Sequence, residues 1–136
     1  MTYEETLHYL YTSIPVFQHS GASAYKPGLG TSIALDDYLG NPHKAYKTIH
    51  VAGTNGKGSV SHLLAAILRQ SGFQVGLYTS PHLVDFRERI RVNGKKISQD
   101  YVVDFVERHR SFFEPLHPSF FELTSSMAFE LSLIHI

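Results

Sequence analysis

The chain has 136 residues, of which 43% are hydrophobic, so it is long enough to fold around a core of its own. Its 12 basic and 12 acidic residues cancel to a net charge of zero, which argues against nucleic acid and anionic membranes as partners. The sequence has no cysteine, an acidic N-terminus unlike a signal peptide, and no run of the ~20 apolar residues that cross a bilayer. We therefore expect a cytoplasmic monomer that binds neither nucleic acid nor membrane.

The N-terminal segment predicts a helix, a loop and a second helix. Thr2 and Glu5 fit a capping box, and apolar residues at helical spacing continue to Ile14 before a proline. Residues 17–30 are rich in glycine and serine and predict a long loop. A short helix over 32–39 should follow, stopped by a Gly-Asn-Pro sequence at 40–42.

The segment 48–68 carries the most specific pattern in the chain. A β-branched run at 48–51 predicts a strand, three glycines lie within 53–58, and a segment with apolar residues at helical spacing follows over 60–68. This context is typical of a phosphate-binding loop, because N–H groups at a helix N-terminus point at the anion. Lys57 would add positive charge for the β- and γ-phosphates, and Ser59 a hydroxyl for phosphate or Mg²⁺. The pattern predicts a site for a nucleoside triphosphate.

The same stretch departs from the Walker A pattern G-x-x-x-x-G-K-[ST]. Val51 stands where that pattern needs glycine, and Gly58 where it needs a hydroxyl. The alternative is an ordinary glycine-rich turn with an exposed lysine. The strand and helix signals on either side favour the nucleotide site.

The second half predicts a strand, a loop, a hairpin and two helices. Residues 73–78 should form a strand parallel to 48–51, since a helix connects the two. Residues 89–92 and 95–97 should pair across an Asn93–Gly94 turn. Helices are expected over 99–113 and from 119 onward. The order predicts an α/β fold, the beginning of a doubly wound parallel sheet.

Three blocks of this sequence together resemble the folylpolyglutamate synthase/dihydrofolate synthase family of the Mur ligase superfamily. They are residues 50–59, 79–94 and 121–129, and the segment 39–42 also fits. The resemblance extends from about residue 28 to 130, and a glycine directly after the lysine is this family's own form of the loop. It implies the P-loop NTPase-like parallel sheet of the Mur ligase central domain with flanking helices, here truncated.

The resemblance also implies a reaction, in which ATP drives the addition of L-glutamate to dihydropteroate or a reduced folate through an acyl phosphate. ATP and Mg²⁺ are the implied cofactors. Lys57 has an implied catalytic role, and Ser80 and Glu122 are the implied magnesium ligands, both being oxygen donors that a hard cation prefers. The implied phosphate-binding residues are Gly53, Thr54, Asn55, Gly56, Lys57, Gly58 and Ser59.

Other interpretations remain open at the level of sequence. Ser80 precedes a proline and could only start a turn, and Glu122 lies three residues after Ser119, where a capping-box glutamate belongs. The chain could also be another P-loop enzyme, such as a Mur peptide ligase or a small-molecule kinase. A third alternative is a truncated nucleotide-binding fragment without catalytic activity.

Three expectations concern the organisation of the chain. Residues 1–130 should be the N-terminal portion of an ATP-binding domain, and the family's C-terminal glutamate-binding domain is absent. Residues 131–136 should be a non-native tail, because they match one reading frame of a transposon end used in sequencing adapters. We expect no ligase turnover from this chain alone.

Overall fold

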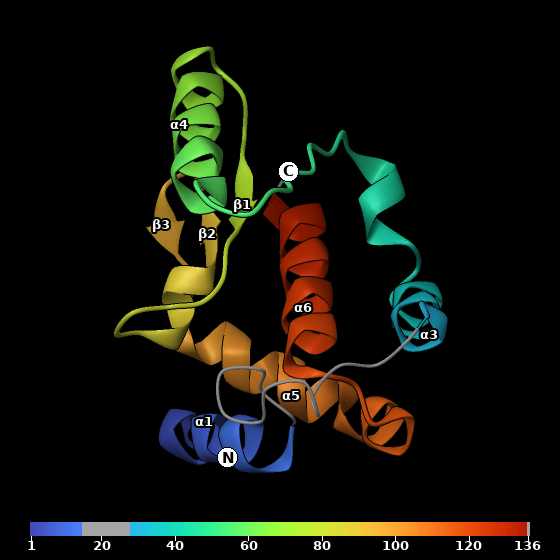
Figure 1. Ribbon diagram of the computed structural model, residues 1–136. Helices are drawn as coiled ribbons and strands as arrows, with labels where there is room; N and C mark the ends of the chain where they lie inside the picture. Colours follow the sequence, from blue (N-terminus) through green and yellow to red (C-terminus); the bar gives the residue numbers. More distant parts are fainter. Residues whose placement is uncertain (15–27, 136) are drawn as a thin grey trace. The chain divides into compact units, whose positions relative to one another are not determined.

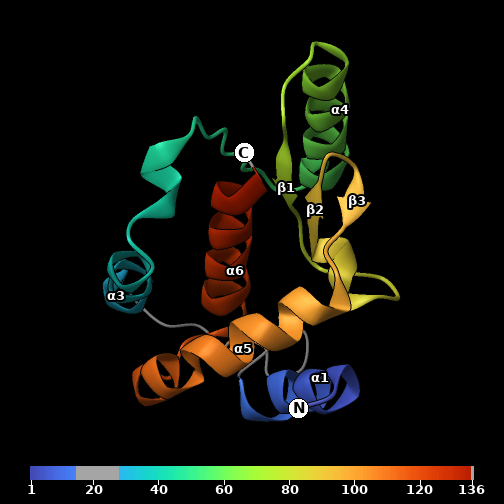
Figure 2. The same ribbon diagram turned by 180° about the vertical axis from the view of Figure 1, so that it is seen from behind.

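The structure is a computed structural model that describes residues 1–14 and 28–135 (Figures 1 and 2). The chain divides into two compact units. The first comprises Met1–Asn41 and Gln99–Met127, and the second comprises Pro42–Ser98 and Ala128–Ile136. The loop predicted over 17–30 lies mostly outside the described residues.

The first unit is helical. Thr2 caps α1 (Tyr3–Ser13) through the predicted capping box: the Glu5 N–H donates to Thr2 Oγ1 over 3.1 Å, and the Thr2 N–H donates to the Glu5 carboxylate over 2.8 Å. Helix α3 (Gly30–Tyr38) begins two residues before the predicted start. Helix α1 packs on α5 (Gln99–Phe113), which turns through η4 (Glu114–Leu116) towards α6 (Phe120–His135).

The apolar side chains of this unit form its core. On α5, Val102, Phe105 and Val106 are buried at helical spacing, and His109 on the same face is partly exposed. The side chains of this core with the least exposure are Leu10, Leu35, Val102, Phe105, Val106, Phe113, Leu123 and Met127. Because all of them lie in α1, α3, α5 or the first half of α6, these helices bury each other's apolar faces.

The second unit contains η2 (Pro42–Ala45), α4 (Lys57–Gln70), η3 (Phe86–Arg89) and a three-stranded antiparallel sheet. Strand β1 (Gly76–Tyr78) pairs with β2 (Ile90–Val92), and β2 pairs with β3 (Lys95–Lys96). The predicted turn between β2 and β3 is confirmed. Asn93 and Gly94 both have positive φ, 51° and 80°, as a type I′ turn requires.

The predicted parallel pairing of 48–51 with 73–78 is not seen in the described part of the chain. Residues 48–51 form no strand there, and β1 begins only at Gly76 and pairs antiparallel with β2. Strands of a parallel sheet are normally covered on both faces. Ile49 of this segment, by contrast, is 65% exposed.

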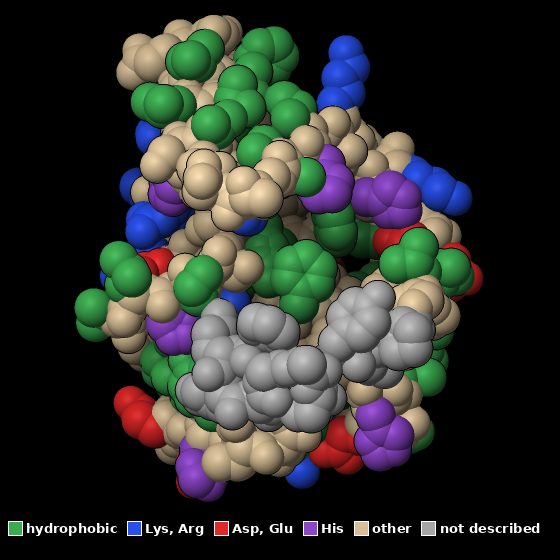
Figure 3. Space-filling model, in the orientation of Figure 1, with side chains coloured by type: hydrophobic (Ala, Val, Ile, Leu, Met, Phe, Trp, Pro, Cys, Tyr) green, Lys and Arg blue, Asp and Glu red, His purple; other side chains and the backbone are tan. Residues whose placement is uncertain are grey.

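Helix α4 has no buried residue, although its sequence is amphipathic. Val60, Leu63 and Ile67 recur at helical spacing and are exposed, and Ile49 and Phe73 of the same unit are exposed too. Figure 3 shows hydrophobic side chains gathered over the part of the surface that α4 forms. We call Val60, Leu63 and Ile67 the exposed α4 face. None of the helices within 1–14 and 28–135 combines the length and hydrophobicity that crossing a membrane requires.

Candidate nucleotide site

The loop before α4 has the backbone shape of an anion-binding turn. Gly56, at the N-cap of α4, has φ 75° and ψ 2°, a left-handed conformation that residues with a Cβ rarely adopt. It directs the chain into the helix, where the first N–H groups have no partner within the helix. The Gly58 and Ser59 amides lie in this first turn. Helix dipole and amides together favour a negatively charged ligand here.

Lys57 lies at the first position of α4 and closes the loop. Its Nζ donates a hydrogen bond of 2.8 Å to the carbonyl oxygen of Gly53, and all residues from 53 to 59 are exposed. The ammonium group is therefore held over the loop from which the amides emerge. A phosphate oxygen could take the place of the Gly53 carbonyl as acceptor.

Ser80 lies in the same unit as this loop. The chain leaves the C-terminal end of α4 at Ser71, turns back, and runs along the helix as β1 (Figure 1). Ser80 follows β1 by two residues, is exposed, and precedes Pro81 across a cis peptide bond. The predicted phosphate loop and Ser80 thus belong to one unit.

The loop after Ser80 is ordered by a glutamate that the sequence did not single out. The Glu88 carboxylate accepts N–H groups from Leu83, Val84 and Asp85 over 3.0, 3.1 and 2.7 Å. The bond from the Leu83 N–H, with those from Asp85 and Val84, lowers the pKa of Glu88. The signal was present as a second capping box, Asp85 with Glu88 three residues later.

A hydrogen bond between the His82 and Arg89 side chains also stabilises this loop. Arg89 is 3% exposed, and its Nε donates to His82 Nδ1 over 2.7 Å. Burial, and then the charge of Arg89, lowers the pKa of His82, so the ring stays neutral and Nδ1 can accept this bond. The geometry gives both residues a role in ordering the loop.

Glu122 lies in the other unit, in the first turn of α6, and it makes the capping box that the alternative interpretation predicted. The Ser119 N–H donates to the Glu122 carboxylate over 3.1 Å, and the Glu122 N–H donates to Ser119 Oγ over 3.1 Å. Among the residues that the structure describes, no three His, Cys, Asp or Glu side chains gather as metal ligands. Ser80 and Glu122 fit a magnesium ion by donor type, since both offer oxygen.

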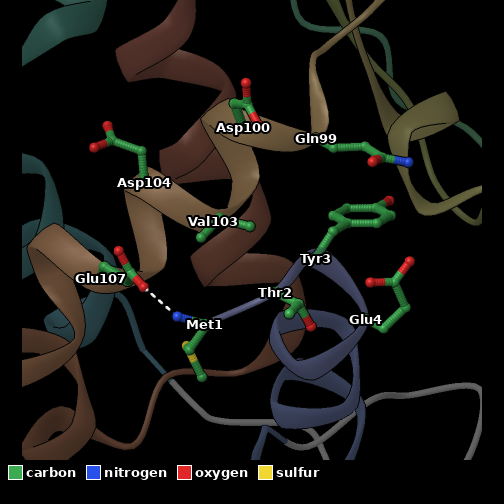
Figure 4. A pocket seen from close by; sticks show the side chains of 9 residues that line it. All are labelled: Met1, Thr2, Tyr3, Glu4, Gln99, Asp100, Val103, Asp104 and Glu107. Carbon is green, nitrogen blue, oxygen red and sulfur yellow. Dashed lines mark hydrogen bonds and ion pairs between the residues drawn. The ribbon is translucent and has the colours of Figure 1, made fainter.

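A cavity of about 420 Å³ lies away from these residues, between α1 and α5 (Figure 4). Acidic side chains surround it, and the Met1 amine bonds to the Glu107 carboxylate over 2.6 Å. This hydrogen bond and the charge of Glu107 raise the pKa of the amine. The lining residues are Met1, Thr2, Tyr3, Glu4, Gln99, Asp100, Val103, Asp104 and Glu107. The Met1 amine is paired with Glu107, and the other charged side chains in the lining are acidic, so this cavity does not suit the phosphates of a nucleotide.

Comparison with known proteins gives consistent relatives. Dihydrofolate synthase/folylpolyglutamate synthase of Bacillus subtilis is 40% identical over 110 residues, covering 76% of this chain and 26% of that protein. Folylpolyglutamate synthase of Thermotoga maritima superposes with a TM-score of 0.84 at 43% identity, over 97% of this chain and 30% of that one. An FPGS–AMPPCP–folate complex superposes with a TM-score of 0.79 at 31% identity, over 96% of this chain and 32% of that one. No family model matches the sequence.

Proposed function

Because this chain belongs to the folylpolyglutamate/dihydrofolate synthase family, we propose that it provides the phosphate-binding part of an ATP-dependent ligase that adds L-glutamate to a pteroate or folate. The chain spans 26% of the length of the Bacillus subtilis relative and 30% of the Thermotoga maritima structure. The activity is therefore proposed for a protein that also contains the remaining parts of those enzymes.

The observation that carries the proposal is the loop 53–59, with its left-handed Gly56 and with Lys57 held across it. Phosphoryl transfer depends mainly on positioning and on neutralising the charge of the transferred group. In the proposed reaction the γ-phosphoryl group of ATP passes to the folate carboxylate and ADP leaves. The glutamate amine then attacks the acyl phosphate, an amide forms, and inorganic phosphate is released.

Each residue of the site has a defined task in this proposal. The Gly58 and Ser59 amides bind phosphate oxygens at the start of α4, and Lys57 exchanges its bond with Gly53 for one with a β- or γ-phosphate. Ser80 and Glu122 would hold Mg²⁺, which supplies charge neutralisation when bound. Glu88 orders the backbone that follows Ser80.

The test is binding of the non-hydrolysable analogue AMPPCP with Mg²⁺, measured by titration calorimetry. Lys57→Ala removes the charge-assisted bond to phosphate and should weaken binding by about tenfold or more. Lys47→Ala, an exposed lysine of the same unit outside the loop, serves as the control and should change binding by less than about twofold.

Equal affinity of Lys57→Ala and Lys47→Ala for AMPPCP would contradict the proposal.

A second test measures turnover. The 136-residue chain should release no phosphate from ATP when given a pteroate and glutamate. A protein that contains this chain and the remaining parts of the family's enzymes should release phosphate only when ATP, the pteroate and glutamate are all present.

A further inference from the structure

A second cavity, of about 360 Å³, lies in the unit that contains α4 and the three-stranded sheet. Its lining is unusual in charge: two guanidinium groups and one imidazole face it, and no acidic side chain does. Its lining residues are His62, Ala65, Ala66, Arg69, Val75, Leu77, Arg91 and Gly94. We call this the α4–β2 cavity.

One face of α4 forms the first wall. His62, Ala65 and Arg69 follow one another at intervals of three and four positions, so they lie on the same side of the helix. The small side chain of Ala65 leaves space between the two longer polar side chains. The wall therefore offers a cation at one end, an imidazole at the other, and an apolar surface between them.

The sheet forms the opposite wall. Arg91 lies opposite Leu77 in the pairing of β2 with β1. Its Nε is completely buried and has no hydrogen-bond acceptor among the residues that the structure describes. A buried charged donor without an acceptor is unfavourable, so the residues that the structure describes leave the Arg91 guanidinium unsatisfied.

The Arg69 guanidinium lies against Gly94, in the turn between β2 and β3. A Cβ at position 94 would collide with the Arg69 guanidinium, and Gly94 has a positive φ of 80° that already favours glycine. The turn between β2 and β3 thus leaves room for the second guanidinium. No hydrogen bond or ion pair joins the Arg69 or Arg91 side chain to another residue in the described part of the chain.

We propose that the α4–β2 cavity binds a small organic anion, with a carboxylate or phosphate group on a short aliphatic stem. Guanidinium groups hold the oxygens of either anion in a bidentate fashion, and neither Arg69 nor Arg91 has an acceptor among the described residues. The stem lies against the apolar part of the lining, which is Ala65, Ala66, Val75 and Leu77. The volume of about 360 Å³ is within the range of small-ligand pockets.

This site goes beyond the proposed ligase function and is separate from the phosphate loop. Lys57 is the first residue of α4 and Arg69 the last but one. At 1.5 Å per residue they lie about 18 Å apart along the helix. A ligand in the cavity would therefore not share its oxygens with the amides of the loop 53–59.

The experiment follows the Nε–Hε NMR signal of Arg91, assigned by its loss in Arg91→Gln, while an anion is added to the 136-residue chain. The probes are glutarate for a carboxylate head, propyl phosphate for a phosphate head, and the neutral glutaramide. Saturable shifts with glutarate, with propyl phosphate or with both support the site and identify its preferred head group. No saturable shift with either anion, or equal binding of glutaramide, overturns it.

Two variants separate the site from a general effect of charge. Arg69→Gln changes an exposed residue and should weaken anion binding by about tenfold. Lys95→Gln removes the same charge from an exposed position outside the cavity and should change binding by less than about twofold. If Arg69→Gln and Lys95→Gln weaken anion binding equally, the proposal is overturned. In Lys57→Ala the anion should shift the Arg91 signal as it does in the wild type. If this variant abolishes the Arg91 shift, the anion binds at the loop 53–59 instead.

Discussion

At the scale of single residues, Asp85 shows how a carboxylate can be held in its charged form. Burial alone would raise its pKa, but hydrogen bonds from the Arg87 N–H, the Arg87 guanidinium and Lys96 lower the pKa to about 2. The guanidinium contact is 3.0 Å long and the ammonium contact 3.2 Å. The lowered pKa means that these interactions stabilise the folded state above the ordinary pKa of about 4. Their contribution is lost as pH falls through about 2.

Asp85→Asn tests this contribution through the free energy of unfolding, measured by urea denaturation as a function of pH. At pH 7 the variant should be less stable by about 1 kcal/mol, since the group is partly solvated. The difference should shrink below about pH 4 and vanish near pH 2. Asp104→Asn removes an exposed i,i+4 pair with Arg108 and should cost only about 0.3–0.5 kcal/mol. A difference for Asp85→Asn that does not depend on pH would refute the assignment.

At the scale of elements, the start of α6 has one glutamate with two proposed tasks, capping the helix and holding Mg²⁺. Glutamine retains the acceptor of a capping box but not the carboxylate charge, whereas alanine retains neither. Glu122→Gln should therefore preserve the stability of the chain and weaken Mg²⁺-dependent AMPPCP binding, while Glu122→Ala should lower both.

Ser119→Ala is the matched control, because it removes the other half of the same cap. It should lower the free energy of unfolding by about 1 kcal/mol and leave nucleotide binding unchanged. If Glu122→Gln binds AMPPCP and Mg²⁺ as the wild type does, Glu122 is a capping residue only.

The elements that sequence predicted well are those specified by neighbouring residues. The caps at Thr2 and Ser119 and the turn at Asn93–Gly94 depend on contacts within a few positions, and all are found. The parallel pairing of 48–51 depends on strands distant in the sequence, and the described residues do not contain it. A phosphate loop at 53–59 stays a prediction from sequence, whereas the carboxylate of Glu88 as acceptor for three amides emerged only from the structure.

At the scale of the whole molecule, burial is unevenly distributed between the two units. Leu123 is 0% exposed and Leu63, on the exposed α4 face, is 65% exposed. The relatives of this chain are several times longer, and an exposed apolar face of this kind is typical of a surface that packs against further protein. In this chain, truncating leucine to alanine at positions 123 and 63 should change the free energy of unfolding by very different amounts.

Leu123→Ala should lower the free energy of unfolding by about 2–5 kcal/mol, because it leaves a cavity in the helical core. Leu63→Ala should change it by no more than about 0.5 kcal/mol. Urea denaturation followed by circular dichroism measures both. Comparable losses would mean that the α4 face is covered in solution, by a second copy of the chain or by another segment of it.

The three amides gathered by Glu88 have a consequence for selectivity. The described residues of this unit include two groups of backbone N–H donors, one after β1 and one at the start of α4. The first is permanently occupied by an anion that the chain itself supplies, and so is closed to phosphate. The second has only the cation Lys57 bound across it. In the described part of this unit, an internal carboxylate thus fills the amides after β1, whereas the amides at the start of α4 are the ones that we propose to bind phosphate.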